Sequence, residues 1–170
     1  MVRAAAGDDD AWQELFDRWK KPLLAFFYRS LGSATEAEDL TLEVFVRLHR
    51  NVARYEPRAS FAAYVFQIAR NLLRNELRRR RRKPADPLPP DAFEDVEADP
   101  AASRLAEIEE TFQRALSELP EAQRTVLLLV AQQQLEPAAA AAVLGITPNA
   151  LRVQLHRARQ RLREIIAHRS

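Results

Sequence analysis

Apolar residues recur every three or four positions along most of the chain, which is the spacing of amphipathic helices. The pattern breaks between residues 84 and 102 and so divides the chain into two stretches. We therefore predict an all-α fold made of two small helical domains. The predicted helices span about 10–31, 33–53 and 60–83 in the first stretch and 103–118 in the second, followed by helices that open at Pro120, Glu136 and Thr147.

Local signals mark where the first three helices begin and end. Gly32 stops the first helix, since glycine readily adopts the left-handed conformation of a helix C-terminus. Ser33 and Glu36 have the spacing of a capping box at the start of the second helix. Ser60 is a suitable N-cap for the third. Pro22 interrupts the first helical pattern, so we expect a kink or a split there.

The break between the two helical stretches is rich in proline and acid. Residues 84–102 contain five prolines and six acidic residues and few large apolar ones. Proline blocks helix formation, and such a segment buries too little apolar surface to fold alone. We predict an extended linker over 84–102 between domains at 1–83 and 103–170.

Composition then narrows the class of protein. Hydrophobic residues make up 47% and charged residues 29%, which is typical of a foldable globular chain. The absence of cysteine excludes disulfides, thiol nucleophiles and cysteine-ligated zinc, and only three histidines are present. No catalytic pattern or metal-ligand spacing is visible, so we expect neither an enzyme nor a cofactor. Because no signal peptide or long apolar run is present, we expect a cytoplasmic protein without membrane insertion.

The small net charge of +2 hides a strong segregation along the chain. Residues 47–83 carry a net +10, the linker carries −6, and residues 147–170 carry +5. Separated basic blocks favour contact with polyanions, while the acidic segments between them favour a protein partner.

The third predicted helix carries the most informative polar face. Opposite its apolar stripe, amides and arginines repeat at three- and four-residue spacing without a single acid. This face comprises Gln67, Arg70, Asn71, Arg74, Asn75 and Arg78. Solvated helix faces usually mix charge signs, whereas phosphates and base edges prefer such an acid-free set. The alternative is an ordinary exposed face in an arginine-rich helix.

The C-terminal stretch contains a helix-turn-helix pattern. Ala141 is small where two helices cross closely, Gly145 suits the turn, and Thr147 caps the second helix. That second helix leaves exposed Asn149, Arg152, Val153, His156, Arg157 and Arg159. A basic helix in this position is typical of a recognition helix that enters the major groove. The alternative is an alanine-rich helical hairpin without a DNA role.

Two segments carry a resemblance to a known family. AEDLTLEVFVRLHRNVARYEPRASFAAYVFQIARNLLRNELRRRRRK, residues 37–83, resembles region 2 of bacterial sigma-70-type factors. ALSELPEAQRTVLLL and LGITPNALRVQLHRARQRLRE resemble their region 4. Both occur in the family's order with no folded domain between them. The chain from about residue 8 to 167 thus resembles an extracytoplasmic-function (ECF, group 4) sigma factor.

The resemblance implies roles for individual residues. Those matching the segment that binds the β′ clamp helices of core RNA polymerase are Asp39, Leu40, Glu43, Arg47 and Leu48. Asn71 matches the position that captures a flipped −10 base, and the rest of the polar face adjoins it. In the −35 recognition helix, Asn149, Arg152, Arg157 and Arg159 are the DNA-binding candidates. The implied partners are core polymerase, through the clamp helices and the β flap, promoter DNA, and an anti-sigma factor.

Several positions depart from the family pattern. Leu42 replaces a glutamine of the polymerase-binding segment, and Val153 and Gln154 replace a polar and a basic residue of the recognition helix. The second hypothesis from the residues is a helix-turn-helix regulator that acts without polymerase. The sequence also leaves open whether the two modules pack together or move independently.

Overall fold

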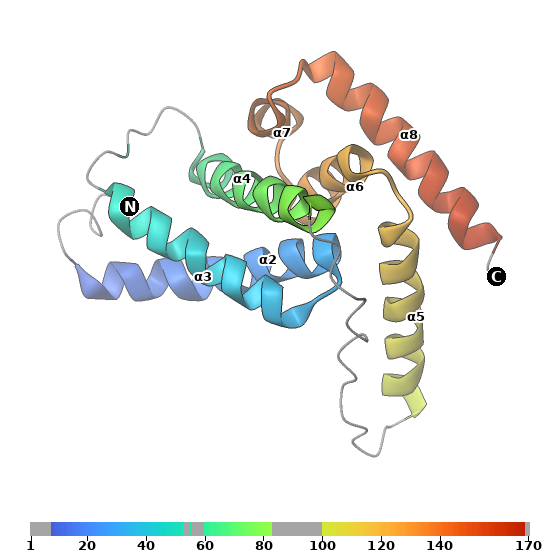
Figure 1. Cartoon of the computed structure of the whole chain (residues 1–170), viewed down its shortest axis with the longest axis horizontal. Coiled ribbons are helices and arrows are strands. Elements are labelled where there is room, and N and C mark those ends of the chain that lie inside the picture. The colour runs from blue at the N-terminus through green and yellow to red at the C-terminus, as the bar shows by residue number, and fades with distance from the viewer. Residues whose placement is uncertain (1–7, 53–54, 56–59, 83–99, 169–170) are drawn as a thin grey trace.

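The computed structural model describes residues 8–52, 55, 60–82 and 100–168. For residues 100–103 and 105 it describes the backbone and not the side chains. Within these ranges the chain forms helices and their connections and no strand (Figure 1), so the all-α prediction is confirmed. The elements are α2 (Asp9–Leu31), α3 (Ala34–Asn51), α4 (Phe61–Arg82), α5 (Pro100–Ser117), α6 (Glu121–Leu127), the π-helical segment η2 (Leu128–Gln132), α7 (Pro137–Leu144) and α8 (Pro148–Ala167).

Most of the predicted helix boundaries hold in the N-terminal module. Gly32 ends α2 in the left-handed conformation, with φ 71°. The Ser60 hydroxyl accepts a hydrogen bond from the Ala63 amide at 3.2 Å, as expected of an N-cap. Only half of the predicted capping box forms, since Ser33 accepts from the Glu36 amide at 3.4 Å while the Glu36 carboxylate pairs with Arg80 instead. The split expected at Pro22 is wrong, because α2 continues through it as one helix.

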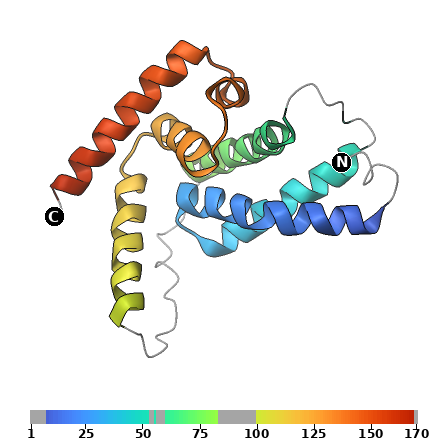
Figure 2. The same cartoon turned by 180° about the vertical axis from the view of Figure 1, so that it is seen from behind.

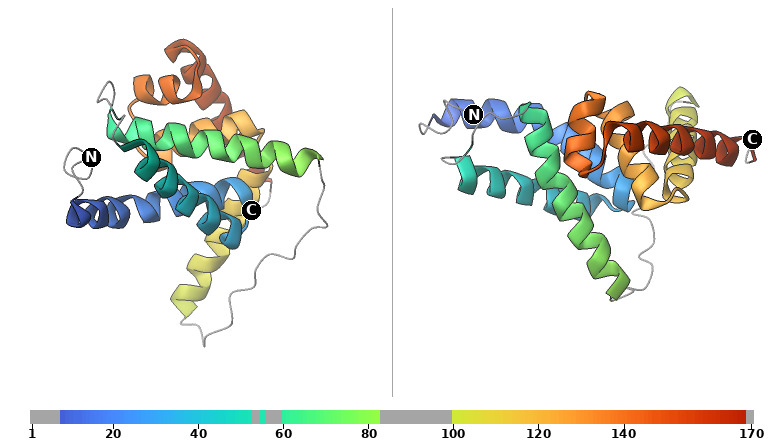
Figure 3. Two further views of the ribbon diagram at one scale, coloured as in Figure 1. Left: turned by 60° about the vertical axis from the view of Figure 1, so that its left-hand side comes forward. Right: turned by 90° about the horizontal axis from the view of Figure 1, so that it is seen from above.

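The three long helices of this module enclose an aromatic core. α2 and α3 run side by side in opposite directions, and α4 crosses over them (Figures 1 and 3). Phe26 and Phe27 of α2 and Phe66 of α4 are almost completely buried. Phe26 lies edge-on to both others, with ring centroids 5.5 Å apart in each pair. This packing fixes the position of α4 against α2 and leaves most of its polar face outward.

The C-terminal module begins earlier than expected and contains the predicted helix-turn-helix. α5 starts at Pro100, three residues inside the predicted linker; the rest of that linker lies outside the described residues. Gly145 adopts the left-handed conformation with φ 66° and joins α7 to α8. The Thr147 hydroxyl accepts from the Ala150 amide at 3.2 Å and so caps α8. Ala141 is buried where α7 packs, as its small size predicts.

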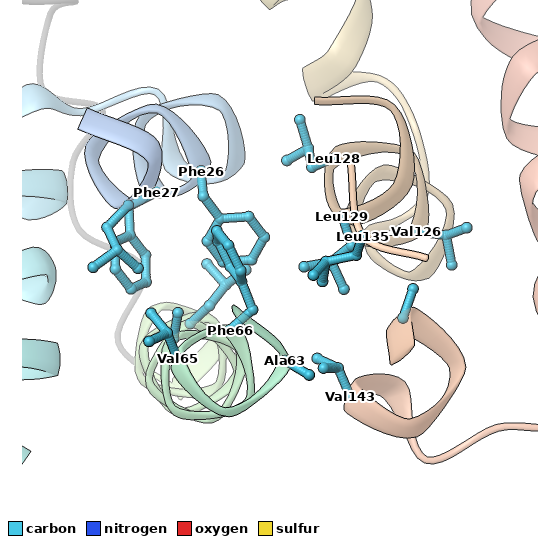
Figure 4. Close-up of a cluster of buried hydrophobic side chains, with 14 of the residues drawn as sticks. Phe26, Phe27, Ala63, Val65, Phe66, Val126, Leu128, Leu129, Leu135 and Val143 are labelled. Carbon is cyan, nitrogen blue, oxygen red and sulfur yellow. The ribbon is translucent and has the colours of Figure 1, made fainter. Parts of the chain in front are cut away.

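The two modules pack against each other through their apolar surfaces. Ala63 of α4 faces Val143 of α7, and both are buried (Figure 4). The hydrophobic cluster extends from α2 and α4 through η2 to α8 without interruption. Figure 2 shows α5 and α8 on the far side of this joint from α3. Of the two arrangements left open by the sequence, the structure has the packed one.

Polar contacts reinforce this joint. The Gln113 side-chain amide of α5 donates to the carbonyl oxygens of Tyr28 at 3.1 Å and Arg29 at 3.4 Å, near the C-terminus of α2. Arg29 forms an ion pair with Glu109 at 2.8 Å and stacks over Phe112 with 5.0 Å to the ring centroid. These contacts bind α5 to the end of α2.

In the described part of the chain, no helix has the length and apolar character needed to cross a bilayer. Within the same residues, no three acidic, histidine or cysteine side chains come together as a metal site would require.

Candidate nucleic-acid interface

The acid-free face predicted on α4 lies mainly on the surface of the module. Gln67, Arg74, Asn75 and Arg78 are exposed, whereas Arg70 and Asn71 are half-buried. Among the described residues, none of the three arginines of this face forms an ion pair. Arginines that form no ion pair on a well-packed helix are well suited to phosphate oxygens. The structure therefore brings together all six residues predicted for this face.

An aromatic cluster adjoins the N-terminal end of this face. Tyr55 lies 4.9 Å from Tyr64 and 5.8 Å from Phe61 between ring centroids. Burial raises the pKa of the Tyr64 hydroxyl above its ordinary value, and the nearby Tyr55 raises it further, so Tyr64 is neutral at physiological pH. Asn71 follows Tyr64 by seven residues, or about two helical turns, on the same side of α4. Aromatic rings, which can stack on bases, and an amide, which can bond to a base edge, thus lie along one side of α4.

The arginine tract at the end of α4 divides between two roles. Arg79 bonds to Glu76 within α4 at 2.8 Å and also pairs with Glu36 of α3 at 3.7 Å. Arg80 pairs with Glu36 and donates to the Leu31 carbonyl at 3.2 Å. These two arginines fasten α4 to the junction of α2 and α3. Arg78 and Arg82 instead border a hollow of about 400 Å³ with Asn75. Within the residues described, neither of these two pairs with an acid, whereas Arg81 pairs with Glu121. Two of the five arginines from Arg78 to Arg82 therefore stay open to an anion.

The exposed side of α8 carries a continuous cationic stripe. Spacings of three and four residues place four side chains on one face, namely Arg152, His156, Arg159 and Arg163, all exposed. Asn149 is exposed at the start of the same helix. Arg157, also predicted to bind DNA, is exposed but lies about 140° around the helix from Arg152. The stripe faces away from the module core, because Leu151 and Ala158 are fully buried on the other side.

The polymerase-binding residues predicted on α3 do not all reach the surface. Asp39 is exposed, Leu40 is half-buried, and Glu43 accepts a hydrogen bond from Arg47 at 2.8 Å while each keeps about two fifths of its side chain exposed. Leu48 has no exposed surface and belongs to the hydrophobic core. We therefore remove Leu48 from the residues expected to contact polymerase, since a side chain enclosed between helices cannot reach a partner protein.

Three exposed residues that share these surfaces were not among the predicted site residues. Leu42 is 61% exposed beside Asp39 and Glu43, although such a large apolar side chain is usually buried. Arg82 continues the α4 face, and Arg163 continues the α8 stripe. Helical spacing could have found all three: Leu42 follows Asp39 by three residues, and each arginine follows a predicted one by four.

Comparison with known proteins agrees with this division into two modules. Residues 15–83 match the model of Sigma-70 region 2, and residues 109–162 match that of Sigma-70 region 4. The sigma factor EcfG of Rhodopseudomonas palustris is 33% identical over 144 residues, which cover 85% of this chain and 78% of EcfG. The chain belongs to the extracytoplasmic-function family of RNA polymerase sigma factors. It is thus a regulatory transcription initiation factor that binds core polymerase and directs it to promoters.

Other relatives of this sigma factor cover nearly all of its length. SigE of Mycolicibacterium smegmatis is 32% identical over 172 residues, which are 98% of this chain but 66% of the longer SigE. SigW of Bacillus subtilis is 27% identical across 93% of this chain and 90% of SigW.

Solved structures resemble the sigma factor over both modules. CnrH, determined in complex with the cytosolic domain of CnrY, matches with a TM-score of 0.73 and 26% identity over 99% of this chain and 96% of CnrH. RpoE of Bartonella quintana, determined with the anti-sigma factor NepR, has a TM-score of 0.75 at 23% identity, over 92% of this chain and 97% of RpoE. The likeness to RpoE concerns the fold.

Proposed function

We propose that this sigma factor, a member of group 4 within its family, divides promoter recognition between two helices. α4 binds and opens the −10 element, and α8 reads the −35 element. The single observation that carries the proposal is that each helix presents an exposed cationic face without acids on the outside of a packed core. Helices held this way contribute specific contacts without further ordering.

On α4, the proposed mechanism combines arginines that bind phosphates with an asparagine that binds a base. Arg74, Arg78 and Arg82 neutralise phosphates, which positions the DNA strand along the helix. Asn71 hydrogen-bonds to an unpaired base that stacks near the aromatic ring of Tyr64. Capture of an unpaired base favours strand opening, since the closed duplex cannot make this contact.

On α8, Asn149 and Arg152 lie in the first turns, the part of a recognition helix that reaches base edges. Arg159 and Arg163, two to three turns later, contact the phosphate backbone. Arg157 lies on a different side from this stripe, so we assign it a contact to a flanking phosphate.

The exposed patch of α3 is the proposed docking surface for the β′ clamp helices. Leu42 supplies an apolar centre, and Asp39 and Glu43 supply polar contacts at its edge, an arrangement common in protein interfaces. A polymerase-independent regulator, the other function considered, would not need this patch.

A protein regulator of this sigma factor is also part of the proposal. CnrH was determined with CnrY, and an anti-sigma partner that covers one or both modules here would keep the factor from polymerase. We propose that the factor acts in the cytoplasm, where its polymerase and DNA partners are.

Run-off transcription with core polymerase tests the central claim. Addition of the sigma factor should yield transcripts with defined start sites, and Asn71→Ala should impair opening of a duplex promoter more than binding to a template with the −10 region already unpaired. A failure to co-purify with core enzyme, together with transcripts that lack defined starts, would overturn the proposal.

A further inference from the structure

A cleft of about 340 Å³ lies where the two modules meet. Arg70 and Arg74 of α4 form one wall, and Glu121 and Ala122 of α6 form another. Gln154 of α8 reaches the same cleft, and Leu144 and Ile146 around the helix-turn-helix turn line its apolar side. Residues of both modules thus line one space beside the joint of α4 and α7.

The charges around the cleft do not balance. Glu121 is its one acidic lining residue, and Arg81 holds that carboxylate at 2.7 Å. Arg70 and the half-buried Arg124 also lie near enough to Glu121 for their charges to interact, and Arg74 adds a further positive charge near Arg70. In the described part of the chain, Arg70 and Arg74 make no salt bridge or hydrogen bond.

Burial makes this imbalance costly to the protein. Loss of solvent lowers the pKa of the Arg70 guanidinium, and repulsion from Arg74 lowers it further, while Glu121 opposes both effects. Burial likewise lowers the pKa of Arg124. An anion placed between Arg70 and Arg74 would relieve the repulsion and replace the lost hydration with charge-assisted hydrogen bonds.

The dimensions of the cleft indicate the size of that anion. Its volume lies at the lower end of the range of small-molecule sites, about 300–1,000 Å³. Duplex DNA is too large to enter a cleft of this volume, because a single groove of the duplex is already about 12 Å across. Two guanidinium groups match the geometry of phosphate oxygens, and the side formed by Leu144 and Ile146 suits a flat or apolar group.

We propose that this cleft is a binding site for a small phosphate-bearing anion up to the size of a nucleotide. Arg70 and Arg74 hold the phosphate, and the Gln154 amide donates to it from the opposite module. Because its contacts come from both modules, the bound anion stabilises their packed arrangement.

Binding is measured on the full chain without DNA or polymerase, by isothermal titration calorimetry with inorganic pyrophosphate and, separately, with ADP. Sodium sulfate at matched ionic strength controls for general salt effects. Arg70→Ala and Arg74→Ala should each weaken pyrophosphate binding by about tenfold. Ala122→Phe fills the cleft without changing any charge and should abolish binding of both probes. Arg18→Ala removes an exposed cation of α2 and should bind as the wild type does.

A thermal-unfolding measurement distinguishes loss of the binding site from loss of the fold. Pyrophosphate should raise the unfolding midpoint of the wild type and leave that of Ala122→Phe unchanged. Tighter binding of ADP than of pyrophosphate identifies a nucleotide as the ligand, and equal affinity identifies the phosphate group alone. No saturable binding of either probe, an equal loss in Arg18→Ala, or undiminished binding in a folded Ala122→Phe variant would each overturn the site. None of these results bears on the assignment as a sigma factor.

Discussion

The cationic stripe of α8 leads to a quantitative prediction about salt. Arg159 is exposed on the same face as Arg152, and no acid among the described residues pairs with it. If Arg159 contacts a DNA phosphate, Arg159→Ala should release one counterion fewer on binding. The slope of log K against log salt concentration should then become shallower by about 0.9.

The slope converts into a measurable difference in affinity. Between 50 and 200 mM salt, which is a fourfold range, one lost phosphate contact changes the relative affinity by roughly 3.5-fold. The wild type should therefore lose about 3.5 times more affinity than Arg159→Ala over this range. Fluorescence anisotropy with the full chain and a labelled −35 duplex measures both slopes, because the stripe is exposed in the packed arrangement.

Arg18→Ala is the matched control. It removes the same charge from an exposed position on α2, which carries neither the α8 stripe nor Arg157. The Arg18 variant should keep the wild-type slope. Equal flattening in both variants would show that DNA responds to the overall charge of the chain, and an unchanged slope in Arg159→Ala would refute the phosphate contact.

Three further predictions concern the remaining surfaces and caps. Thr147→Ala removes the N-cap of α8 and should lower the free energy of unfolding by about 1 kcal/mol in urea denaturation, with Thr147→Ser restoring most of it. Leu42→Asp should weaken the binding of core polymerase at least tenfold in a pull-down titration without shifting the unfolding midpoint, since Leu42 is 61% exposed; an unaffected complex would remove α3 from the interface. Arg80→Ala should cost about 1 kcal/mol of stability, because it breaks the tie to Glu36 across partly exposed groups, whereas Arg82→Ala should change stability by less than about 0.5 kcal/mol.

Sequence reasoning located the helices well because their boundaries depend on neighbouring residues. Ser60 and Thr147 cap the helices that follow them, and Gly145 takes the positive φ that the turn requires. The exposed basic stripes of α4 and α8 were also predictable, since helical spacing alone decides which residues share a face.

Contacts between distant segments were beyond such reasoning. The arginine tract looked uniform in sequence, yet Arg80 pairs with Glu36 and Arg81 with Glu121, each about 40 residues away. Helical spacing places Leu48 on the apolar stripe of α3 but does not tell whether this residue packs in the core or contacts a partner. Only the packing of the helices shows that it lies in the core. The π-helical segment η2 lies before the connection to α7, and the residue types in Leu128–Gln132 do not predict it.

The joint between α4 and α7 has a consequence for the geometry of a promoter. The −35 and −10 elements lie about 25 base pairs apart by name, which is ~85 Å along a duplex at 3.4 Å per pair. In the packed arrangement, α4 and α8 contribute side chains to a single cleft. If α4 and α8 bind these elements as proposed, one molecule in this shape reaches one element at a time. Spanning both would then require separation of Ala63 from Val143 and of Arg29 from Glu109, so the free energy of these contacts would be subtracted from the affinity for a whole promoter.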